Sequence, residues 1–293
     1  MQPSTFSIAA CDLEKREWGV AVASKFLASG AVVSWARAEV GAIATQARAK
    51  VGYGHEGLSL LAEGESAIAA LEAITSVDDD RAERQVGIVD RSGRAAAHTG
   101  EKCFDWAGHR VGDGYTCQGN ILVGPEVLEA MAESFELATG ELADRLVSAL
   151  RAGDEAGGDR RGKQSAAVLV VREDGGYGGD TDRYLDLRVD DDPEPTRRLQ
   201  ELVAMHHVFF MPAIELEMIP IEAEVAQELQ ALSRQLGYYE GEADGKWDQA
   251  SKEAFEALIS NENLEERWSL DQDPDVIDRV ALDYLRLRFS QED

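Results

Sequence analysis

The chain has 293 residues, enough for one large domain or for two domains. It carries 56 acidic and 29 basic residues, so its formal net charge is −27. A surface this acidic repels phosphate backbones and anionic lipids, and we expect neither a nucleic acid nor a membrane as a partner. Arginine outnumbers lysine, and this balance fits a protein adapted to concentrated salt as well as an ordinary acidic one.

The cysteines and the apolar runs indicate the cellular compartment in which the protein is located. Cys11, Cys103 and Cys117 lie far apart and form no CxxC pair, which argues against a disulfide framework and a thiolate zinc site. The start of the sequence lacks the basic segment and apolar run of a signal peptide. No run approaches the roughly 18–20 apolar residues of a spanning helix. We expect a cytoplasmic, soluble protein without a metal or a cofactor.

Short strands dominate the first part of the chain. The strand-like runs lie at 5–12, 19–26, 31–38 and 40–47. The first two are joined by DLEKREWG and predict a hairpin. Helical stretches follow at 55–64 and 65–78. A second hairpin is predicted around Asp90-Arg91-Ser92-Gly93.

A strand at 115–124 then leads into two helices. Pro125 is suited to the first position of a helix, and the helices are predicted at 125–138 and 140–153. A glycine-rich polar loop precedes strand-like runs at 165–173 and 183–190. The order of strands, then helices, then strands predicts an α+β fold with largely antiparallel sheets covered by helices.

The composition changes at 190–198, where DDDPEPTRR marks a boundary. The 98 residues from Thr196 onward contain 22 acidic and 9 basic residues. Their pattern predicts four helices, at about 196–208, 222–236, 247–259 and 275–289. We predict two domains, 1–192 and 193–293, of which the second is small and all-α.

Eight sequence blocks in the first domain carry a resemblance. They are STFSIAA, GVAVASKF, IATQA, RQVGIVD, HTG, WAGHRVG, QGNILVG and GGDRRGKQSAA. In this order they resemble domain-of-unknown-function family 1028, which is grouped by fold with the N-terminal-nucleophile (Ntn) hydrolases. The resemblance implies a four-layer αββα sandwich, an amidohydrolase site at the start of the first strand and assembly into a homo-oligomer.

A second resemblance covers about residues 225–260. Leu236-Gly237-Tyr238-Tyr239, Asp244-Gly245, Trp247 and Phe255 form a helix, a glycine stop, a tight turn and a second helix. This pattern is similar to a peptidoglycan-binding-type repeat. It implies peptidoglycan as a partner, but without a signal peptide we favour a structural or assembly role.

The family resemblance makes Thr5 the candidate nucleophile. A threonine hydroxyl needs a base, and the α-amine of an N-terminal residue, with a pKa near 8, can serve directly or through a water. This amine becomes free only if the chain is cleaved between Ser4 and Thr5. The alternative is that Thr5 is simply a β-branched strand residue.

The first hairpin places either Ser24 or Lys25 opposite Thr5, because its register is uncertain by one residue. An ammonium group next to the hydroxyl would favour its ionised form. The alternative for Lys25 is a solvent-facing position at the end of the strand.

Other polar residues complete the candidate site. Gly119 and Asn120 could stabilise an oxyanion, Asp159 could orient the α-amine, and Arg160 could pair with a substrate carboxylate. Further candidates for binding substrate are Gln46, Gln118, Gln164 and Ser165. Each of these residues could instead have a structural role, as buried amides that join loops or as a solvated loop.

We therefore predict an Ntn-type amidohydrolase that cleaves a small amide or ureido C–N bond. The alternatives are a catalytically silent binding or scaffolding protein and a cell-wall adaptor, which would require export. A thiol–imidazole pair of Cys11, Cys103 or Cys117 with His98 or His109 is a competing site that no sequence spacing supports.

Overall fold

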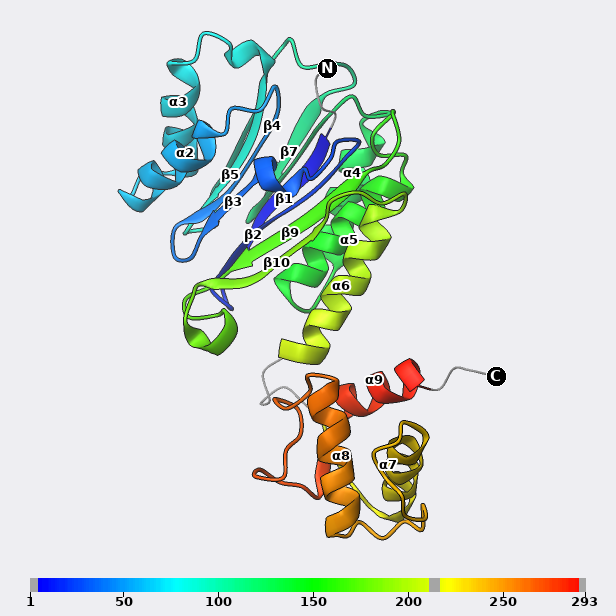
Figure 1. Cartoon of the computed structure of the whole chain (residues 1–293). Helices are drawn as coiled ribbons and strands as arrows, with labels where there is room; N and C mark the ends of the chain where they lie inside the picture. The colour runs from blue at the N-terminus through cyan, green and yellow to red at the C-terminus, as the bar shows by residue number, and fades with distance from the viewer. Residues whose placement is uncertain (1–4, 211–216, 290–293) are drawn as a thin grey trace. The chain divides into compact units, whose positions relative to one another are not determined.

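The computed structural model describes residues 5–210 and 217–289. The chain divides into two compact units, 1–203 and 204–293, which we describe separately. The first unit is mixed α+β and the second is mainly helical (Figure 1). The predicted domain boundary after residue 192 stays a prediction.

A six-stranded antiparallel sheet forms the centre of the first unit. Its strand order is β10-β9-β2-β1-β8-β7. The bounds are β1 Thr5–Asp12, β2 Glu17–Ser24, β7 Gly108–Gly112, β8 Tyr115–Asn120, β9 Ser165–Val171 and β10 Arg183–Val189. The predicted first hairpin is confirmed, with Asp12 paired to Glu17 at its turn and Thr5 paired to Ser24 at its open end.

A second sheet of four strands packs against the first. Its order is β3-β4-β5-β6. The bounds are β3 Ser34–Arg37, β4 Gly41–Ala47, β5 Arg84–Asp90 and β6 Ala95–Thr99. The hairpin predicted around Asp90 is confirmed as β5–β6. A buried cluster that includes Ala9 and Val20 of the first sheet and Ala44 and Val89 of the second fills the space between them.

Helices cover the other face of each sheet (Figure 1). Their bounds are α2 Gly52–Ala62, α3 Ala67–Ser76, α4 Glu126–Leu137, α5 Leu142–Glu155 and α6 Pro195–Phe210. The short helix α1 Gly30–Val33 instead adds Val33 to the cluster between the sheets. The helices α4 and α5 bury Leu128 and Leu146 against Phe6 and Ile8 of β1. The helices α2 and α3 pack with the outward-facing residues of β4 and β5. Alternate residues of β1 thus face the helices and the second sheet, as the period of a strand requires.

The described part of the second unit contains three further helices and a short sheet. The bounds are α7 Ala223–Gln235, α8 Gln249–Asn261, α9 Arg279–Phe289, β11 Met218–Pro220 and β12 Val276–Asp278. The prediction of an all-α domain did not include the antiparallel pair β11–β12, because strands of three residues carry little sequence pattern. Phe255, Trp268 and Leu282 lie in its core. Within the described residues, no helix is both long and apolar enough to span a bilayer.

Candidate active site

Four polar residues form a row across one end of the six-stranded sheet. The register pairs Thr5 with Asn120 of β8 on one side and with Ser24 of β2 on the other. Ser24 is in turn paired with Ser165 of β9. Directly paired residues share a face of the sheet, and Ser7 on the same face of β1 contacts Gln46 of the second sheet. The row Asn120–Thr5–Ser24–Ser165 therefore faces the space between the two sheets, and all four residues are buried.

The Thr5 hydroxyl has a hydroxyl as its neighbour. Its Oγ1 atom lies 3.2 Å from the Oγ atom of Ser24. The structure thus resolves the two predicted registers in favour of Ser24. Lys25 is exposed, and its Nζ atom donates to the carbonyl oxygen of Lys163 at 3.0 Å. The predicted contact between the Lys25 ammonium and Thr5 is not present, because a slip of one residue turns a side chain to the other face.

The side chain of Gln46 ties Thr5 to the second sheet. Its Nε2 atom donates to the carbonyl oxygen of Thr5 at 3.3 Å and to that of Gln118 at 3.2 Å. Its Oε1 atom accepts a 2.6 Å hydrogen bond from Ser7. Gln118 in turn donates to the Ser7 hydroxyl at 2.7 Å. The predicted site residues Gln46 and Gln118 are therefore brought together beside Thr5, as parts of one buried network.

Gln85 of β5 stands at the centre of this network. Its Oε1 atom accepts from Gln46 at 2.8 Å and from Asn120 at 3.0 Å. Its Nε2 atom lies within hydrogen-bond distance of the carbonyl oxygens of Gly108 and Gly119 and of the Thr99 hydroxyl. Gln85 is a site residue that the sequence did not identify as a candidate. Only the packing of distant strands brings it to Thr5, and no local motif signals it.

Gly119 lies inside the ladder of the sheet. It is paired with Phe6 of β1 on one side and with Gly108 of β7 on the other. Backbone groups of a strand with two neighbours point along the sheet toward those neighbours. Asn120, whose side chain faces the space between the sheets, is therefore the better placed of the two predicted oxyanion donors.

Asp159 contacts the residues that follow the two strands flanking β1. It forms an isolated antiparallel bridge with Leu122, which follows the end of β8. Its Oδ2 atom also accepts from the backbone N–H of Lys25, which follows the end of β2, at 2.8 Å. Asp159 thus lies between the continuations of the two strands that flank β1.

The carboxylate of Asp159 accepts as many hydrogen bonds as it has acceptor positions. Arg161 donates to it from its backbone N–H, its Nε atom and a terminal nitrogen, at 2.9, 3.2 and 3.0 Å. The Lys25 N–H is the fourth donor, and a carboxylate offers about four acceptor positions. The structure places Asp159 beside Leu122 and Lys25, and its contacts are those of a residue that fixes the loop. Arg161, which the sequence analysis passed over, holds it there. The predicted role of Asp159 in orienting the α-amine stays a prediction.

The remaining candidates support loops around the site. The Ser165 hydroxyl donates to the Phe26 carbonyl oxygen at 2.6 Å and lies 2.7 Å from the Ser29 hydroxyl. Gln164 donates to Asp191 at 3.0 Å. The Arg160 backbone N–H donates to the Ile121 carbonyl oxygen, and its side chain is exposed. Ser165 therefore lies in the row with Thr5, whereas Gln164 and Arg160 lie on the loop that precedes it.

Three non-glycine residues next to the site have left-handed backbones. Ala28, Ala47 and Ile121 have φ values of 52°, 64° and 53°. Ala47 follows Gln46 and Ile121 follows Asn120, and a β-branched residue in this region is a clear outlier. Backbone strain of this kind clusters at functional sites, where the surrounding structure holds it in place.

The competing thiol–imidazole site has no support in the structure. All three cysteines are buried. Burial, with help from the charge of Asp12, raises the pKa of Cys11 to about 12, and burial also raises the pKa of Cys103 and Cys117. Cys103 donates to the carbonyl oxygen of Arg84 at 3.3 Å. These thiols behave as small apolar groups.

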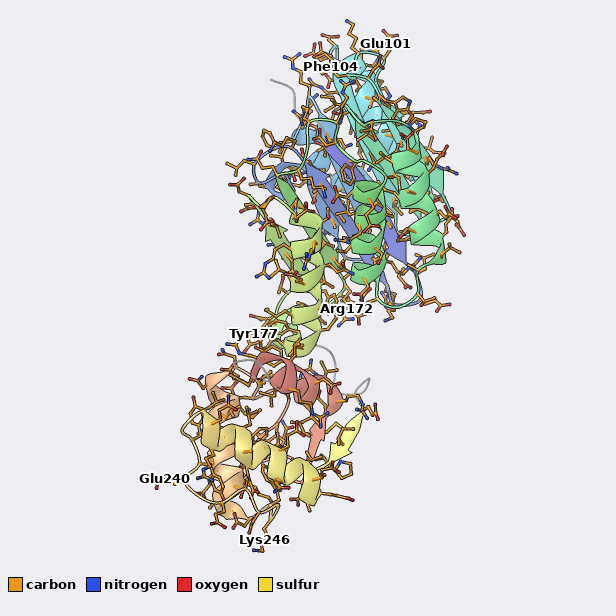
Figure 2. All side chains as sticks on the ribbon, turned by 90° about the vertical axis from the view of Figure 1, so that its right-hand side faces the viewer. Glu101, Phe104, Arg172, Tyr177, Glu240 and Lys246 are labelled. Atoms are coloured by element: carbon orange, nitrogen blue, oxygen red, sulfur yellow. The ribbon has the colours of Figure 1, made fainter. Side chains whose placement is uncertain are left out.

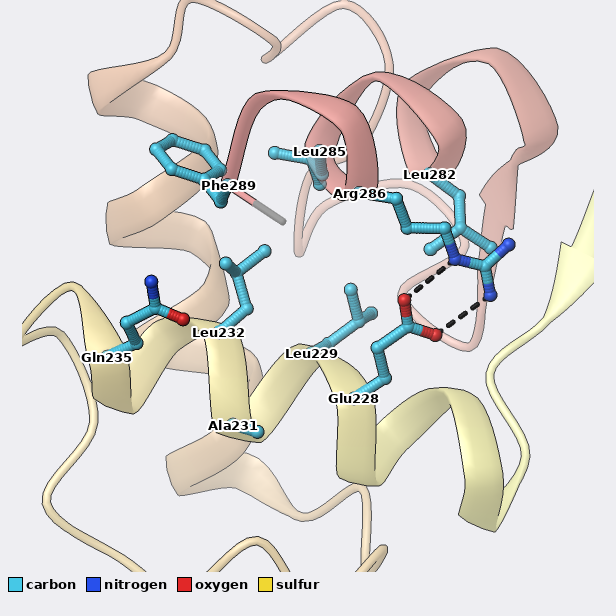
Figure 3. Close-up of a pocket in the computed structure, with 9 residues that line it drawn as sticks. All are labelled: Glu228, Leu229, Ala231, Leu232, Gln235, Leu282, Leu285, Arg286 and Phe289. Carbon is cyan, nitrogen blue, oxygen red and sulfur yellow. Dashed lines mark hydrogen bonds and ion pairs between the residues drawn. The ribbon is translucent and has the colours of Figure 1, made fainter. Parts of the chain in front are cut away.

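The second unit contains an apolar groove between α7 and α9 (Figure 3). Its volume is about 230 Å³, and Leu229, Leu232 and Leu285 lie along it. At one end, Arg286 and Glu228 form a forked ion pair with distances of 2.7 and 2.8 Å. Aliphatic walls of this kind suit apolar groups and offer few partners for sugar hydroxyls.

Comparison with known proteins defines the class of the first unit. Residues 5–199 match the family of unknown function DUF1028, and residues 210–285 match a putative peptidoglycan binding domain. The chain belongs to the family of unknown function DUF1028. It is similar to a solved protein of this family from Silicibacter pomeroyi, with 33% identity and a TM-score of 0.64. That similarity covers 70% of this chain and 86% of the other. No curated protein matches the chain.

Proposed function

We propose that this protein is an N-terminal-nucleophile hydrolase that cleaves a C–N bond of a small amide or ureido compound. The observation that carries the proposal is the position of Thr5. It is the first residue of a strand inside the six-stranded sheet, and its side chain faces the second sheet. A nucleophile at the start of such a strand, once it is the first residue of the chain, presents its hydroxyl and its amine at the same point.

The neighbours of Thr5 make the α-amine the natural base. Among the residues that the structure describes, the side-chain contacts around Thr5 come from Ser24 and Gln46, and Asn120 is its paired neighbour. All three are neutral, and none can take a proton near pH 7. The α-amine, with an ordinary pKa near 8, can. We give Lys25 no part in this step, because its ammonium group contacts Lys163.

The reaction would run in two steps. The Thr5 oxygen attacks the amide carbonyl and transfers its proton through the α-amine to the leaving nitrogen, so that the C–N bond breaks and an ester with Thr5 remains. Water then attacks the ester, the acid leaves, and Thr5 regains its proton. Asn120 would donate to the oxyanion in both steps.

The arrangement of layers supports the Ntn assignment. The helices α4 and α5 pack on one sheet, the helices α2 and α3 pack on the other, and the two sheets pack face to face. This order of helices, sheet, sheet and helices is what the proposed four-layer αββα sandwich requires. The homo-oligomer and the cytoplasmic location that we predict rest on family resemblance and on composition.

Mass spectrometry of the purified full chain tests the proposal. We expect a chain that begins at Thr5, and we expect periodate to oxidise its 1,2-amino alcohol, which a preceding residue would block. Thr5→Ala should remove the periodate reaction and all amidase activity, whereas Thr5→Ser should retain both. A protein that begins ahead of Thr5 in its mature form, or a fully active Thr5→Ala variant, would overturn the proposal.

One observation favours the catalytically silent alternative. Thr5 is only 1% exposed, so a substrate cannot reach its hydroxyl in the chain as described. A binding or scaffolding protein would retain this buried row of polar residues for stability alone. The chain start found by mass spectrometry separates the two functions, since the silent protein has no need of a free Thr5 amine.

We infer a structural or assembly role for the peptidoglycan-binding-like unit. Its groove is mostly apolar. The polar groups of the turn at Gly245 are bound from within the unit, because Gln230 makes hydrogen bonds with Gly245, Lys246 and Ser251. Purified peptidoglycan should therefore leave the full chain in the supernatant on sedimentation. Co-sedimentation that free muropeptides compete away would instead support the wall adaptor.

A further inference from the structure

The side chain of Gln85 can take only one orientation. Its nitrogen faces the carbonyl oxygens of Gly108 at 3.0 Å and Gly119 at 2.7 Å. Backbone carbonyls accept hydrogen bonds and never donate them, so the NH₂ end of the amide must point toward them. Rotating the amide by half a turn would place an oxygen against two oxygens in a site without solvent, because Gln85 is fully buried.

This fixed orientation passes to the neighbouring amides. With its nitrogen held by the backbone, Gln85 must present Oε1 to Gln46 and Asn120. Each of them must then turn its own NH₂ group toward Gln85. For Gln46, the same NH₂ group reaches the Thr5 carbonyl oxygen. Its NH₂ group also faces the Gln118 carbonyl oxygen, so two backbone carbonyls fix the direction of Gln46 independently. The direction that follows from Gln85, and so from the backbone carbonyls of Gly108 and Gly119, is that of Asn120.

We propose that Gln85 is a positioning residue that sets the direction of the Asn120 amide beside Thr5. The role of Asn120 as an oxyanion donor rests on the function proposed above. The orientation itself does not depend on catalysis. An amide turned the wrong way would direct its oxygen, and so its negative end, at a developing oxyanion, which makes the direction of Asn120 decisive.

The second unit supplies a matched control. Gln230 of α7 is also buried and also makes several hydrogen bonds, to Lys246, Ser251 and Gly245. Replacing either glutamine by methionine removes a buried amide and keeps an unbranched side chain of similar length. Both changes should therefore lower stability, but only the change at Gln85 should affect Asn120 and Thr5.

The experiment compares the wild-type chain with Gln85→Met and Gln230→Met. The first readout is hydrogen exchange of the Asn120 side-chain NH₂ by NMR, with the signals assigned through their loss in Asn120→Ala. The second is the rate at which a β-lactone acylates Thr5, followed by intact mass and peptide mapping. In that reaction the Thr5 oxygen opens the lactone ring and the freed alkoxide takes the proton, so the adduct carries the full lactone mass.

We expect Gln85→Met to speed exchange of the Asn120 NH₂ and to slow acylation at least about tenfold, because a misdirected donor loses part of the roughly 10²–10³-fold effect of removing an oxyanion donor outright. The pH midpoint of acylation should stay unchanged, because the amine is still the base. Gln230→Met should leave both readouts within about twofold of wild type. If Gln85→Met does not fold, Gln85→Asn replaces it in the experiment. This variant keeps a buried amide, but the shorter side chain cannot reach both the backbone carbonyls and the amides of Gln46 and Asn120.

The two proposals fail in different ways. If wild-type Thr5 is not acylated at all, the nucleophile is wrong, and the exchange of Asn120 still tests the role of Gln85. If a folded Gln85→Met variant keeps slow exchange at Asn120 and the wild-type acylation rate, Gln85 is only a structural residue and the inference is overturned.

Discussion

Thr5 and Ser24 are directly paired at the open end of the β1–β2 hairpin, with their hydroxyl oxygens 3.2 Å apart. Both side chains are buried in the space between the two sheets. Such a hydroxyl pair cannot generate a base, but it fixes the direction of the threonine oxygen. The pair therefore sets the geometry of the candidate nucleophile, while the proton chemistry must come from elsewhere.

Removing the Ser24 hydroxyl should weaken the fold and slow any reaction of Thr5. We expect Ser24→Ala to lower the free energy of unfolding by about 1 kcal/mol, the usual net value of one buried hydrogen bond. Urea denaturation measures this change, and Ser24→Thr, which keeps a hydroxyl, is the control. A Ser24→Ala variant that reacts with a β-lactone as fast as wild type would show that the pair has no part in positioning Thr5.

Gly87 should tolerate no side chain. A Cβ atom there would lie 2.1 Å from Oε1 of Gln118 and 2.3 Å from Oγ1 of Thr116. We expect Gly87→Ala to lower the free energy of unfolding by about 1–3 kcal/mol, because the amide network must shift. At Gly52, at the start of α2, the nearest atom is the flexible end of Glu56, so Gly52→Ala should be neutral or slightly stabilising. Equal stabilities of the two variants would contradict this account.

Glu17 should make stability fall as pH rises. Burial raises the pKa of Glu17 above its ordinary value of 4.5, and Arg172, 3.1 Å away, offsets only part of this. Between pH 4.5 and the raised pKa the folded state binds more protons than the unfolded state, so deprotonation costs stability there. Relative to Glu17→Gln, wild type should lose up to about 1.4 kcal/mol per pH unit in this window.

Urea unfolding between pH 4 and 8 measures how the free energy of unfolding changes with pH, with Glu56→Gln on the exposed face of α2 as the control. If this free energy has the same pH dependence in wild type and in Glu17→Gln, the prediction is wrong. The site at Thr5 should not respond, because Glu17 pairs with Asp12 at the opposite end of β1. Figure 2 labels Arg172, the ion-pair partner of Glu17, and, at the other end of the first unit, Phe104, whose carbonyl oxygen accepts from the N–H of Ile121 next to Asn120.

Asp78 should be a large contributor to stability at neutral pH. Burial alone would raise the pKa of Asp78, but hydrogen bonds from Arg84 and Tyr53 outweigh it and hold the pKa well below its ordinary value. This stabilisation is present above about pH 4 and is lost as the pH falls through the lowered pKa. We expect Asp78→Asn to cost about 3 kcal/mol at pH 7, because the buried Arg84 loses its partner.

The neighbouring Asp80 offers the matched control for this prediction. Asp80 also contacts Arg84, at 3.4 Å, but half of its side chain is exposed. Asp80→Asn should therefore cost less than about 1 kcal/mol. Chemical denaturation of both variants at pH 7 and pH 3 makes the comparison. At pH 3 the gap between Asp78→Asn and wild type should narrow.

The strands and helices of this fold could largely be predicted, because their patterns are local. The hairpin 5–24, the turn at Asp90 and the helix that begins near Pro125 all follow from alternation, turn residues and apolar spacing. The composition change near 190 predicts a boundary after residue 192, which stays a prediction, and the second compact unit begins at residue 204. The short pair β11–β12 was missed because three residues cannot establish a period.

The site was predictable only where a residue belongs to the first hairpin or to a family motif. Thr5, Gln46, Gln118 and Asn120 do come together, although the sequence could not say which groups they contact. Ser24 was the partner of Thr5 in one of the two possible hairpin registers, and no sequence pattern pointed to Gln85. The role of Gln85 depends on how β5 packs against β7 and β8. Nothing within one strand determines which distant carbonyl oxygens its amide will face.

Asp159 joins the two strands that flank Thr5, and this has a consequence for the chain beside the threonine. Leu122, which follows β8, is bridged to Asp159, and the backbone N–H of Lys25, which follows β2, donates to its carboxylate. Because β2 and β8 are not neighbours in the sheet, Asp159 is a crosslink between two strand ends that β1 otherwise keeps apart. Loss of the carboxylate should therefore loosen both of these ends at once, while the pairings of β1 itself stay in place.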